Sequence, residues 1–162
     1  MSSPFPTCDH DHGACLNDVV ARAEMVCTQN HARLTVLRKE VLTILAASHR
    51  AMTAYEILEE MVVGGTRKPA PITVYRTLEF LMSMALVHRI ESRNAYFVCY
   101  QHGDHHDQAV QVWICRSCGV VAETNSPQMV TLIPQLAQEI GFKTVSTIVE
   151  VEGECRTCQQ QA

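Results

Sequence analysis

Two CxxC pairs constrain this chain more than any other feature. The first is Cys115 and Cys118 in WICRSCG, and the second is Cys155 and Cys158 in GECRTC. One pair could be a redox dithiol, but two pairs supply the four thiolates of a tetrahedral zinc site. A closed shell of four cysteines leaves no open coordination position, so the predicted zinc is structural and its binding free energy stabilises the fold. Two redox dithiols, or free buried thiols, are the alternatives.

The bulk composition favours a globular protein that binds metal rather than one held by disulfides. The 162 residues fit one large domain or two small ones, and 47% of them are hydrophobic, which is enough for a packed core. No apolar run approaches the ~20 residues of a membrane span, and the N-terminus lacks the pattern of a signal peptide. We therefore expect a cytoplasmic protein, where eight cysteines indicate metal or redox chemistry.

The first half of the chain shows helical periodicity with identifiable helix starts. A helix is expected over 16–28, and Thr35 is placed to cap a second one. Thr53 and Glu56 have the T-x-x-E spacing of a capping box for a third helix. A break at GGTRKPAP precedes a fourth helix, which begins near Pro71.

After the fourth helix the hydrophobic period changes to two. The segments LVHRIE and AYFVC flank Ser92-Arg93-Asn94, a pattern that predicts a β-hairpin. Helices followed by a hairpin indicate a winged helix-turn-helix, in which the fourth helix would read DNA. The second half reads as strand, strand, helix and strand, so the expected fold class is α+β with a small mixed α/β domain at the C-terminal end. Its helix should run from Ser126-Pro127 to Gly141-Phe142, with a kink or a break at Pro134.

The charge distribution supports DNA binding only locally. A formal net charge of −4 argues against a generic nucleic-acid binder, but the window 61–78 holds Arg67, Lys68 and Arg76 and no acidic residue. The apolar face of the fourth helix should pack inward and leave polar side chains outward, where Arg76 could reach a guanine edge or a phosphate. The alternative is an ordinary amphipathic surface. The DNA-binding candidates are Thr73, Tyr75, Arg76 and Lys68.

A second group of metal-binding residue types lies between the two halves. Each of them would alone be an ordinary surface or structural residue. Together they lie where one half must hinge on the other, so a metal held by them would fix the angle between the halves. The group comprises His88, Cys99, His102, His105, His106 and Glu123.

These motifs together resemble the ferric uptake regulator superfamily, and most of all its zinc-uptake regulators. The resemblance covers about 16–160 and rests on TVYRTLEFL, LVHRIES, AYFVC, WICRSCG and GECRTC, in order and at suitable spacing. It implies a homodimer that binds palindromic operator DNA when loaded with metal. It divides the chain into a flexible His/Cys-rich arm (1–15), a winged-helix DNA-binding domain (16–99), a hinge linker (100–108) and a zinc-stapled dimerisation domain (109–162).

The resemblance also implies a regulatory ligand set. In the zinc-sensing branch this set is a wing histidine, a cysteine at the end of the wing, a linker histidine and a glutamate after the first CxxC. These correspond to His88, Cys99, His106 and Glu123, with His105 as the second choice for the linker ligand. The Cys99 thiol favours zinc over iron on grounds of softness. Two Zn²⁺ ions per chain are therefore expected.

The N-terminal stretch CDHDHGAC leaves one further possibility open. Cys8, His10, His12 and Cys15 could form an accessory zinc site, or the stretch could be a tail that binds metal adventitiously. The expected function is a zinc-responsive repressor of zinc-uptake genes. The alternatives are the same fold sensing iron, manganese, nickel or peroxide, and a zinc-ribbon adaptor that does not bind DNA. A zinc hydrolase would need an open metal with a base, as in HExxH, and the sequence has none.

Overall fold

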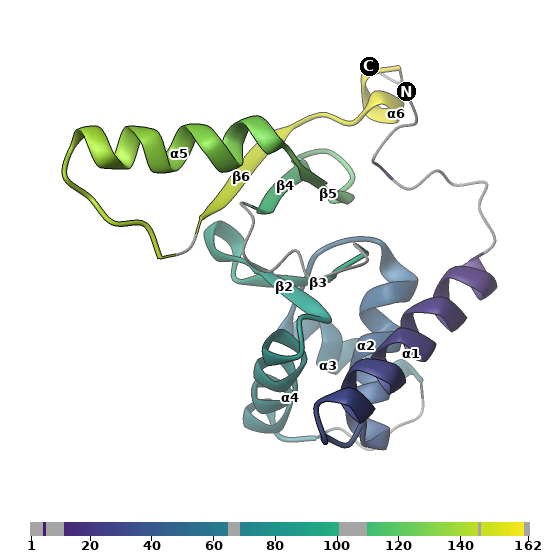
Figure 1. Ribbon diagram of the computed structural model, residues 1–162. Coiled ribbons are helices and arrows are strands. Elements are labelled where there is room, and N and C mark those ends of the chain that lie inside the picture. The colour runs from purple at the N-terminus through teal and green to yellow at the C-terminus, as the bar shows by residue number, and fades with distance from the viewer. Residues whose placement is uncertain (1–4, 6–11, 65–68, 101–109, 146, 161–162) are drawn as a thin grey trace. The chain divides into compact units, whose positions relative to one another are not determined.

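The chain forms two compact units, and each has its own sheet. The computed structural model describes residues 5, 12–64, 69–100, 110–145 and 147–160 (Figure 1). We call Thr7–Tyr100 the winged-helix unit, and Gln101–Ala162 with Met1–Pro6 the cysteine unit. Among the described residues, none of the helices has the length and apolar character needed to cross a membrane.

The winged-helix unit has four helices and a three-stranded sheet. Its first helix begins at His12, four residues before the predicted start. The unit contains α1 (His12–Gln29), α2 (Val36–Ser48), β1 (Met52–Thr53), α3 (Ala54–Val63), α4 (Pro71–Ser83), β2 (Val87–Ile90), the short 3-10 turn η1 (Glu91–Arg93) and β3 (Ala95–Val98).

The helix starts in this unit follow the predicted capping chemistry. The Thr35 side chain accepts a hydrogen bond from the backbone N–H of Arg38 at the start of α2. Thr53 and Glu56 form a complete capping box at α3, in which each side chain bonds the other residue's backbone N–H. Pro71 occupies the first turn of α4, where its missing N–H costs no hydrogen bond.

The wing hairpin is present, and a strand that the sequence did not reveal completes its sheet. β2 and β3 pair antiparallel, and Asn94 closes the turn with a φ of 47°, a backbone conformation that asparagine tolerates. β1 pairs with the outer edge of β3 and gives the order β1-β3-β2. Apolar side chains from all four helices and the sheet share one buried core, which includes Leu42, Ile57 and Leu78.

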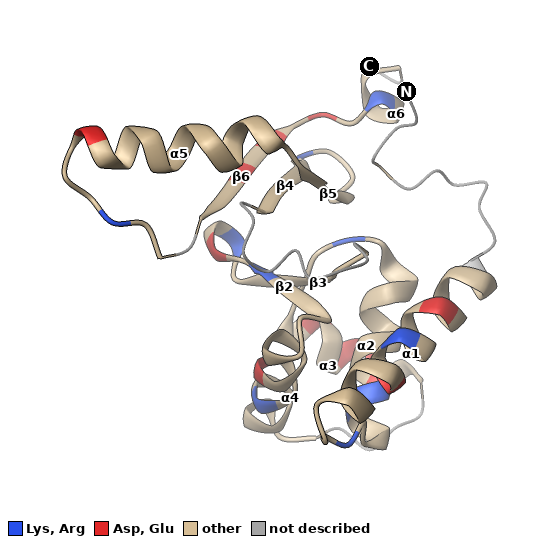
Figure 2. Cartoon of the chain, viewed as in Figure 1, with Lys and Arg blue, Asp and Glu red and all other residues tan. Residues whose placement is uncertain are grey.

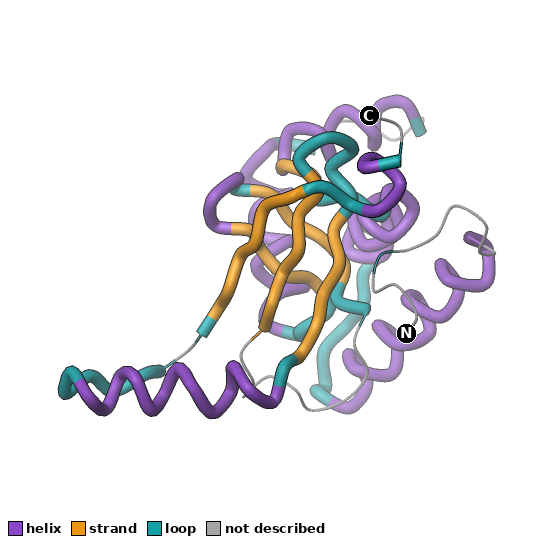
Figure 3. Tube along the Cα trace, turned by 90° about the horizontal axis from the view of Figure 1, so that it is seen from above, coloured by secondary structure: helices purple, strands orange, loops and turns teal. Residues whose placement is uncertain are grey.

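The cysteine unit has a second three-stranded sheet, in the order β5-β4-β6. β4 pairs antiparallel with β5 and parallel with β6. Figure 3 shows these strands running side by side. The unit contains β4 (Val110–Cys115), β5 (Val121–Asn125), α5 (Pro127–Glu139), β6 (Ile148–Gly153) and α6 (Arg156–Gln159).

The helix α5 ends as the sequence predicted, but it is not broken at its internal proline. Gly141 has a φ of +70°, and the N–H groups of Gly141 and Phe142 donate to the carbonyls of Gln138 and Ala137, which is a Schellman motif. α5 runs through Pro134 without interruption (Figure 1), so the break that was predicted as one of two outcomes, a kink or a break, does not occur. The short helix α6 at the second CxxC was also not predicted.

These two units confirm the predicted fold class. The chain is α+β, with a winged helix-turn-helix followed by a small mixed sheet-and-helix domain. The helix-turn-helix consists of α3 and α4, and the wing is the β2–β3 hairpin.

Candidate metal centre and DNA-binding surface

The backbone of the cysteine unit brings the two CxxC pairs together. β4 ends at Cys115, and its parallel register places Cys115 beside Gly153 at the end of β6. The chain then turns at Gly119, whose φ of +74° suits a residue without a side chain. The second pair begins two residues after Gly153, where Cys155 caps α6. The paired strand ends therefore determine where all four thiols lie.

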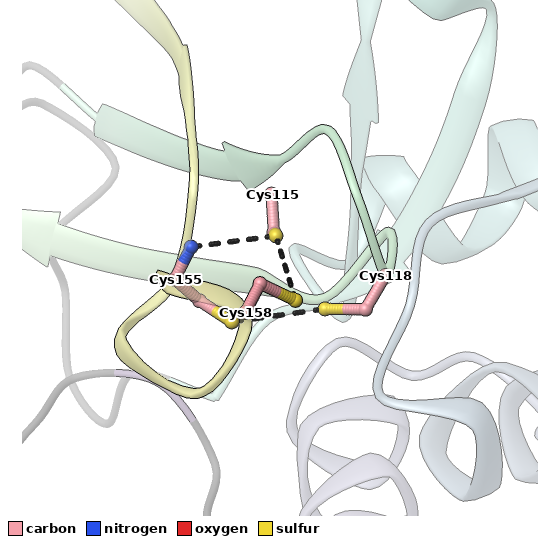
Figure 4. A group of neighbouring side chains, drawn as sticks. All are labelled: Cys115, Cys118, Cys155 and Cys158. Atoms are coloured by element: carbon pink, nitrogen blue, oxygen red, sulfur yellow. Dashed lines mark hydrogen bonds between the residues drawn. The ribbon is translucent and has the colours of Figure 1, made fainter. Parts of the chain in front are cut away.

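The four sulfur atoms have the spacing of a tetrahedral thiolate site. Sγ of Cys115 lies 3.8 Å from Sγ of Cys158, and Sγ of Cys118 lies 3.8 Å from Sγ of Cys155 (Figure 4). All four sulfurs lie within 4.8 Å of one another. A tetrahedron with Zn–S bonds of about 2.3 Å has edges of about 3.8 Å. A disulfide would need a separation of about 2.05 Å, so this is the arrangement of separate thiols around a common centre.

The electrostatics of this cluster also favour a cation. Burial raises the pKa of the Cys115 thiol, but the backbone N–H groups of Cys155, Cys118 and Ser117 stabilise its thiolate, and the balance lowers its pKa to about 6. The hydrogen bonds that Cys158 makes with Cys155 and Cys118 raise the pKa of its thiol to about 12. A divalent metal ion at the centre of the four sulfurs would supply the positive charge that favours their thiolate form.

A second pair of side chains that could hold a metal ion lies on one face of the wing hairpin. His88 on β2 pairs with Phe97 on β3, and their rings are 5.5 Å apart between centroids. Cys99 is two residues beyond Phe97 and so projects from the same face. One ring nitrogen of His88 and Sγ of Cys99 lie within 4.8 Å of each other. The Cys99 side chain is only 6% exposed.

The other predicted metal ligands are either in the cysteine unit or outside the described residues. Glu123 lies on β5, opposite Val112 on β4, and is half-buried. The candidates outside the described residues are the linker histidines His102, His105 and His106, and Cys8 and His10 of the N-terminal stretch. The backbone of His12 begins α1, and Cys15 is half-buried in the same helix.

The predicted reading helix presents a mixed surface. Val74, Leu78 and Leu81 are fully buried against the core, as the helical spacing of the apolar residues predicted. Arg76 is exposed, whereas Thr73 and Tyr75 are half-buried, and Tyr75 packs partly against the core. Lys68 lies outside the described residues.

Basic side chains also surround the wing. Figure 2 shows blue segments on α4 and around the β2–β3 hairpin, where Arg89 and Arg93 lie. Arg89 forms an ion pair with Glu91 at 3.5 Å. The wing, with two arginines and one glutamate, has a net positive charge that suits a nucleic-acid backbone, whereas α4 carries Arg76 together with the acidic Glu79.

Two groups of residues near these sites were not singled out from the sequence. Arg22 on α1 donates a hydrogen bond to the carbonyl of Cys99, 77 residues away in the sequence. A basic residue within the apolar stripe of α1 was the signal available for it. The second group is an exposed apolar surface of the cysteine unit, for which the signal was the hydrophobic periodicity of α5. It comprises Leu132, Leu136, Ile140, Phe142, Val145 and Ile148.

The chain is similar to zinc uptake regulators in both sequence and structure. It matches the ferric uptake regulator family over residues 29–152. The zinc uptake regulation protein of Escherichia coli (strain K12) is 33% identical over 141 residues, which cover 87% of this chain and 81% of that protein. The protein of the same name from Mycobacterium tuberculosis (strain ATCC 25618 / H37Rv) is 30% identical over 130 residues, covering 78% and 95%.

Two solved structures extend this similarity to the fold. A zinc uptake regulator complexed with zinc and DNA superimposes with a TM-score of 0.79 at 31% identity, over 90% of this chain and 96% of that one. The holo form of XcZur superimposes with a TM-score of 0.77 at 33% identity, over 89% and 99%.

Proposed function

Because the chain belongs to the ferric uptake regulator family, we propose that it is a zinc-responsive, DNA-binding transcriptional regulator that represses zinc-uptake genes. It is a regulator and not an enzyme, in keeping with that family. Its zinc uptake relatives and the relative bound to zinc and DNA support this function. The observation that carries it is the pairing of a thiol and an imidazole, Cys99 and His88, on the hairpin of a DNA-binding motif.

The four cysteines of the cysteine unit are the proposed ligands of a structural zinc. Their sulfur spacing and the lowered pKa of the Cys115 thiol fit a closed tetrahedral site, as described above. In the part of the unit that the structure describes, few other hydrophobic side chains are buried; they include Val112 and Ile114 of β4 and Val121 of β5. A core this small contributes little stability, so the binding of zinc by these ligands would supply much of the free energy of folding of the unit.

The regulatory zinc is a separate proposal, and it rests on residues of both units. His88 and Cys99 form one half of the ligand set on the wing. Glu123 of β5 and His106 of the linker are the proposed other half, because they supply the carboxylate and the second imidazole that complete four-coordination. A zinc ion in this set would join the two units through its bonds to their side chains. The chain would then bind two Zn²⁺ ions, and the thiol of Cys99 selects zinc over the harder iron(II) and manganese(II).

The proposed DNA contacts follow from the winged-helix unit. α4 is the recognition helix for the major groove, and the exposed Arg76 is the side chain best suited to a base edge. Thr73 and Tyr75 are half-buried, so they suit contacts to the phosphate backbone, which Lys68 would extend. Arg93 on the wing adds a further positive charge beside the helix.

A homodimer is proposed because the cysteine unit exposes several large apolar side chains, most of them on α5. Leu132, Leu136 and Ile140 follow one another at helical spacing on α5, with exposed fractions of 46%, 50% and 79%. Phe142 and Ile148, outside the helix, are also exposed. Exposed apolar side chains that gather on one face mark protein–protein interfaces. A two-fold dimer would also present two reading helices to a palindromic operator, and the cytoplasm is where such a regulator would act.

Regulation would then follow from a zinc ion whose ligands come from both units. When His88 and Cys99 share a metal with Glu123, the reading helices of a dimer are held at one spacing. When these ligands are released, the units sample many angles and few of them match the operator. A coupling free energy of about 1–3 kcal/mol, or 5–150-fold in affinity, is sufficient for such a switch.

Selection of operator DNA from a random pool tests the metal and the function together. The protein should retain its tetrad zinc, and zinc, iron(II) or manganese(II) should be added in separate selections. The proposal expects one palindromic sequence to be enriched with zinc and much less with the other two ions. Equal enrichment without any added metal, or enrichment with iron(II) alone, would contradict it.

A further inference from the structure

Arg22 lies on the face of α1 that packs against the core of the winged-helix unit. Val19, Ala23 and Cys27 on the same stripe are 5%, 0% and 2% exposed. Arg22 itself is half-buried. A guanidinium on an apolar stripe is unfavourable unless a polar group receives its hydrogen bonds. Its position therefore calls for a specific partner.

That partner is the main chain of Cys99. The Arg22 guanidinium donates to the Cys99 carbonyl, and this hydrogen bond is made by a charged donor, which makes it stronger than a neutral one. The N–H of Cys99 donates in turn to the carbonyl of Leu86, with 3.0 Å between the nitrogen and the oxygen. Both peptide groups of Cys99 are therefore fixed, one by the wing and the other by α1. Fixing them fixes the direction of the Cα–Cβ bond, and so the position from which Sγ reaches the His88 ring.

The next residue is fixed as well. The Tyr100 hydroxyl lies 3.0 Å from Nδ1 of His49 and 3.3 Å from the carbonyl oxygen of Ala46, both at the end of α2. The rings of Tyr100 and His49 are stacked with their centroids 5.7 Å apart. Residues 99 and 100 are thus attached to α1 and α2 before the linker begins.

We propose that Arg22 is a positioning residue for the regulatory metal site: it holds Cys99 so that Sγ and the His88 ring form a ready half-site on the wing. This inference rests on the proposed function of Cys99 and His88. Arg22 donates to the peptide carbonyl of a ligand and acts through that ligand. Removing such outer partners typically costs about 10–100-fold in metal affinity.

The test measures operator binding against buffered free zinc for the parent protein and for Arg22→Met, which keeps an unbranched side chain on the stripe. The expected result is a rise of about tenfold or more in the free zinc needed for half-maximal binding. Operator affinity at saturating zinc should stay near that of the parent, and so should the tetrad zinc content. A purely structural role would instead weaken operator binding at every zinc concentration, and that result would overturn the proposal.

Two further variants keep the test informative should Arg22→Met fold poorly. Arg22→Lys retains a charged donor but not the guanidinium geometry, so it should raise the half-maximal zinc concentration above that of the parent by less than Arg22→Met does. Tyr100→Phe removes only a hydroxyl and should raise the half-maximal zinc concentration in the same direction, by less. An unchanged zinc midpoint in both would overturn the proposal.

Arg38 offers a matched control in the same unit. It is also half-buried, and its guanidinium donates to the carbonyl of Arg33 at 2.6 Å while lying over the Phe80 ring. Arg38→Met removes a comparable hydrogen bond away from the metal ligands. It should leave the zinc midpoint where it is in the parent. A shift equal to that of Arg22→Met would mean that any loosening of the unit has this effect, and would overturn the proposal.

Cobalt(II) separates this inference from the proposed function. Added to protein that keeps its tetrad zinc, cobalt should give a thiolate charge-transfer band in the parent and none in Cys99→Ser. Arg22→Met should give the same band, but only at higher cobalt concentration. If Cys99→Ser keeps both the band and the zinc response, the proposed regulatory site is wrong and the inference falls with it. If Cys99→Ser loses both and Arg22→Met matches the parent, the positioning role alone is wrong.

Discussion

At the scale of single residues, Arg76 is the most exposed of the described side chains predicted to read DNA. Arg76→Ala should weaken binding to the selected operator by about 1–3 kcal/mol if the guanidinium contacts a base. Fluorescence anisotropy with operator DNA and with scrambled DNA, over a range of salt concentrations, measures this directly. Operator binding equal to that of the parent at every salt concentration would make Arg76 an ordinary surface residue.

Lys68→Ala is the comparison for Arg76→Ala. Removing a lysine that contacts only phosphate should weaken binding to both DNAs alike. It should also reduce the slope of log affinity against log salt concentration by about one. Different losses for the two DNAs in Lys68→Ala would indicate a base contact instead.

The positions of several candidate site residues could be foreseen from the sequence, and the reason is local. The spacing of Cys115 and Cys118 fixes a turn with two thiols, whatever the rest of the chain does. The strand period places His88 on the wing, and Cys99 follows at its end. Arg22 could not be foreseen as their neighbour, because its contact with Cys99 joins residues 77 positions apart and depends on how α1 packs.

At the scale of elements, the capping box of α3 gives the winged-helix unit a pH-dependent contribution. Hydrogen bonds from the backbone N–H and the hydroxyl of Thr53 lower the pKa of Glu56 below its usual value. A lowered carboxyl pKa means that this stabilisation is present above the unfolded-state value, about 4.3, and is lost as pH falls through the folded-state value. The free energy of unfolding gained by the parent over Glu56→Ala should therefore shrink as the pH falls below about 4.3.

Chemical denaturation of both proteins at each pH, followed by circular dichroism, measures that difference. Thr53→Ala removes the other half of the box and should cost about 1 kcal/mol near neutral pH. A difference between parent and Glu56→Ala that stays constant down to pH 3 would contradict the capping account.

The exposed face of α5 carries the dimer prediction. Leu136→Glu places a charge in the middle of the apolar surface, next to Leu132 and Ile140, and should shift the protein toward monomer. Sedimentation velocity measures the shift, with Gln138→Glu as the control because Gln138 is exposed on the same helix. If Leu136→Glu stays a dimer at the parent's concentrations, the interface lies elsewhere.

Elements with strong local signals were predictable, and those defined by pairing were not. Caps at Thr35 and Thr53 and the stop at Gly141 are side-chain or backbone rules that act within one turn. β1 has only two residues, and its Thr53 is also the cap of α3, so only its pairing with β3 identifies it. At Pro134 the expected break did not occur, because the remaining hydrogen bonds and the cap at Gly141 sustain α5 on both sides.

At the scale of the whole molecule, the cysteine unit should depend on its metal for stability. Cys158→Ser removes one of the four sulfurs and should cost one zinc per chain, lower the free energy of unfolding of the cysteine unit and weaken its dimer. Zinc content by atomic absorption and mass by light scattering measure both effects. A soluble, dimeric Cys158→Ser protein with the parent's zinc content would contradict the structural-zinc proposal.

The division into a helical half with a wing and a second half with the CxxC pairs was visible in the sequence because the hydrophobic period changes between them. The helical period ends where the alternation of β2 and β3 begins, and the CxxC pairs appear only afterwards. The linker ligand was not predictable to a single residue, because three histidines, His102, His105 and His106, lie within five positions. No periodicity distinguishes among them.

The most direct test of the central claim is operator affinity measured against buffered free zinc for the parent, Cys99→Ser and His88→Ala, with tetrad zinc and oligomeric state checked in parallel. The account predicts a steep rise in affinity with zinc for the parent and a flat, weak response for both variants, whose tetrad zinc and dimer remain intact. It also predicts that operator DNA tightens zinc binding in the parent only, because the coupling is reciprocal. A Cys99→Ser protein with the parent's zinc response would contradict it and place the regulatory metal elsewhere.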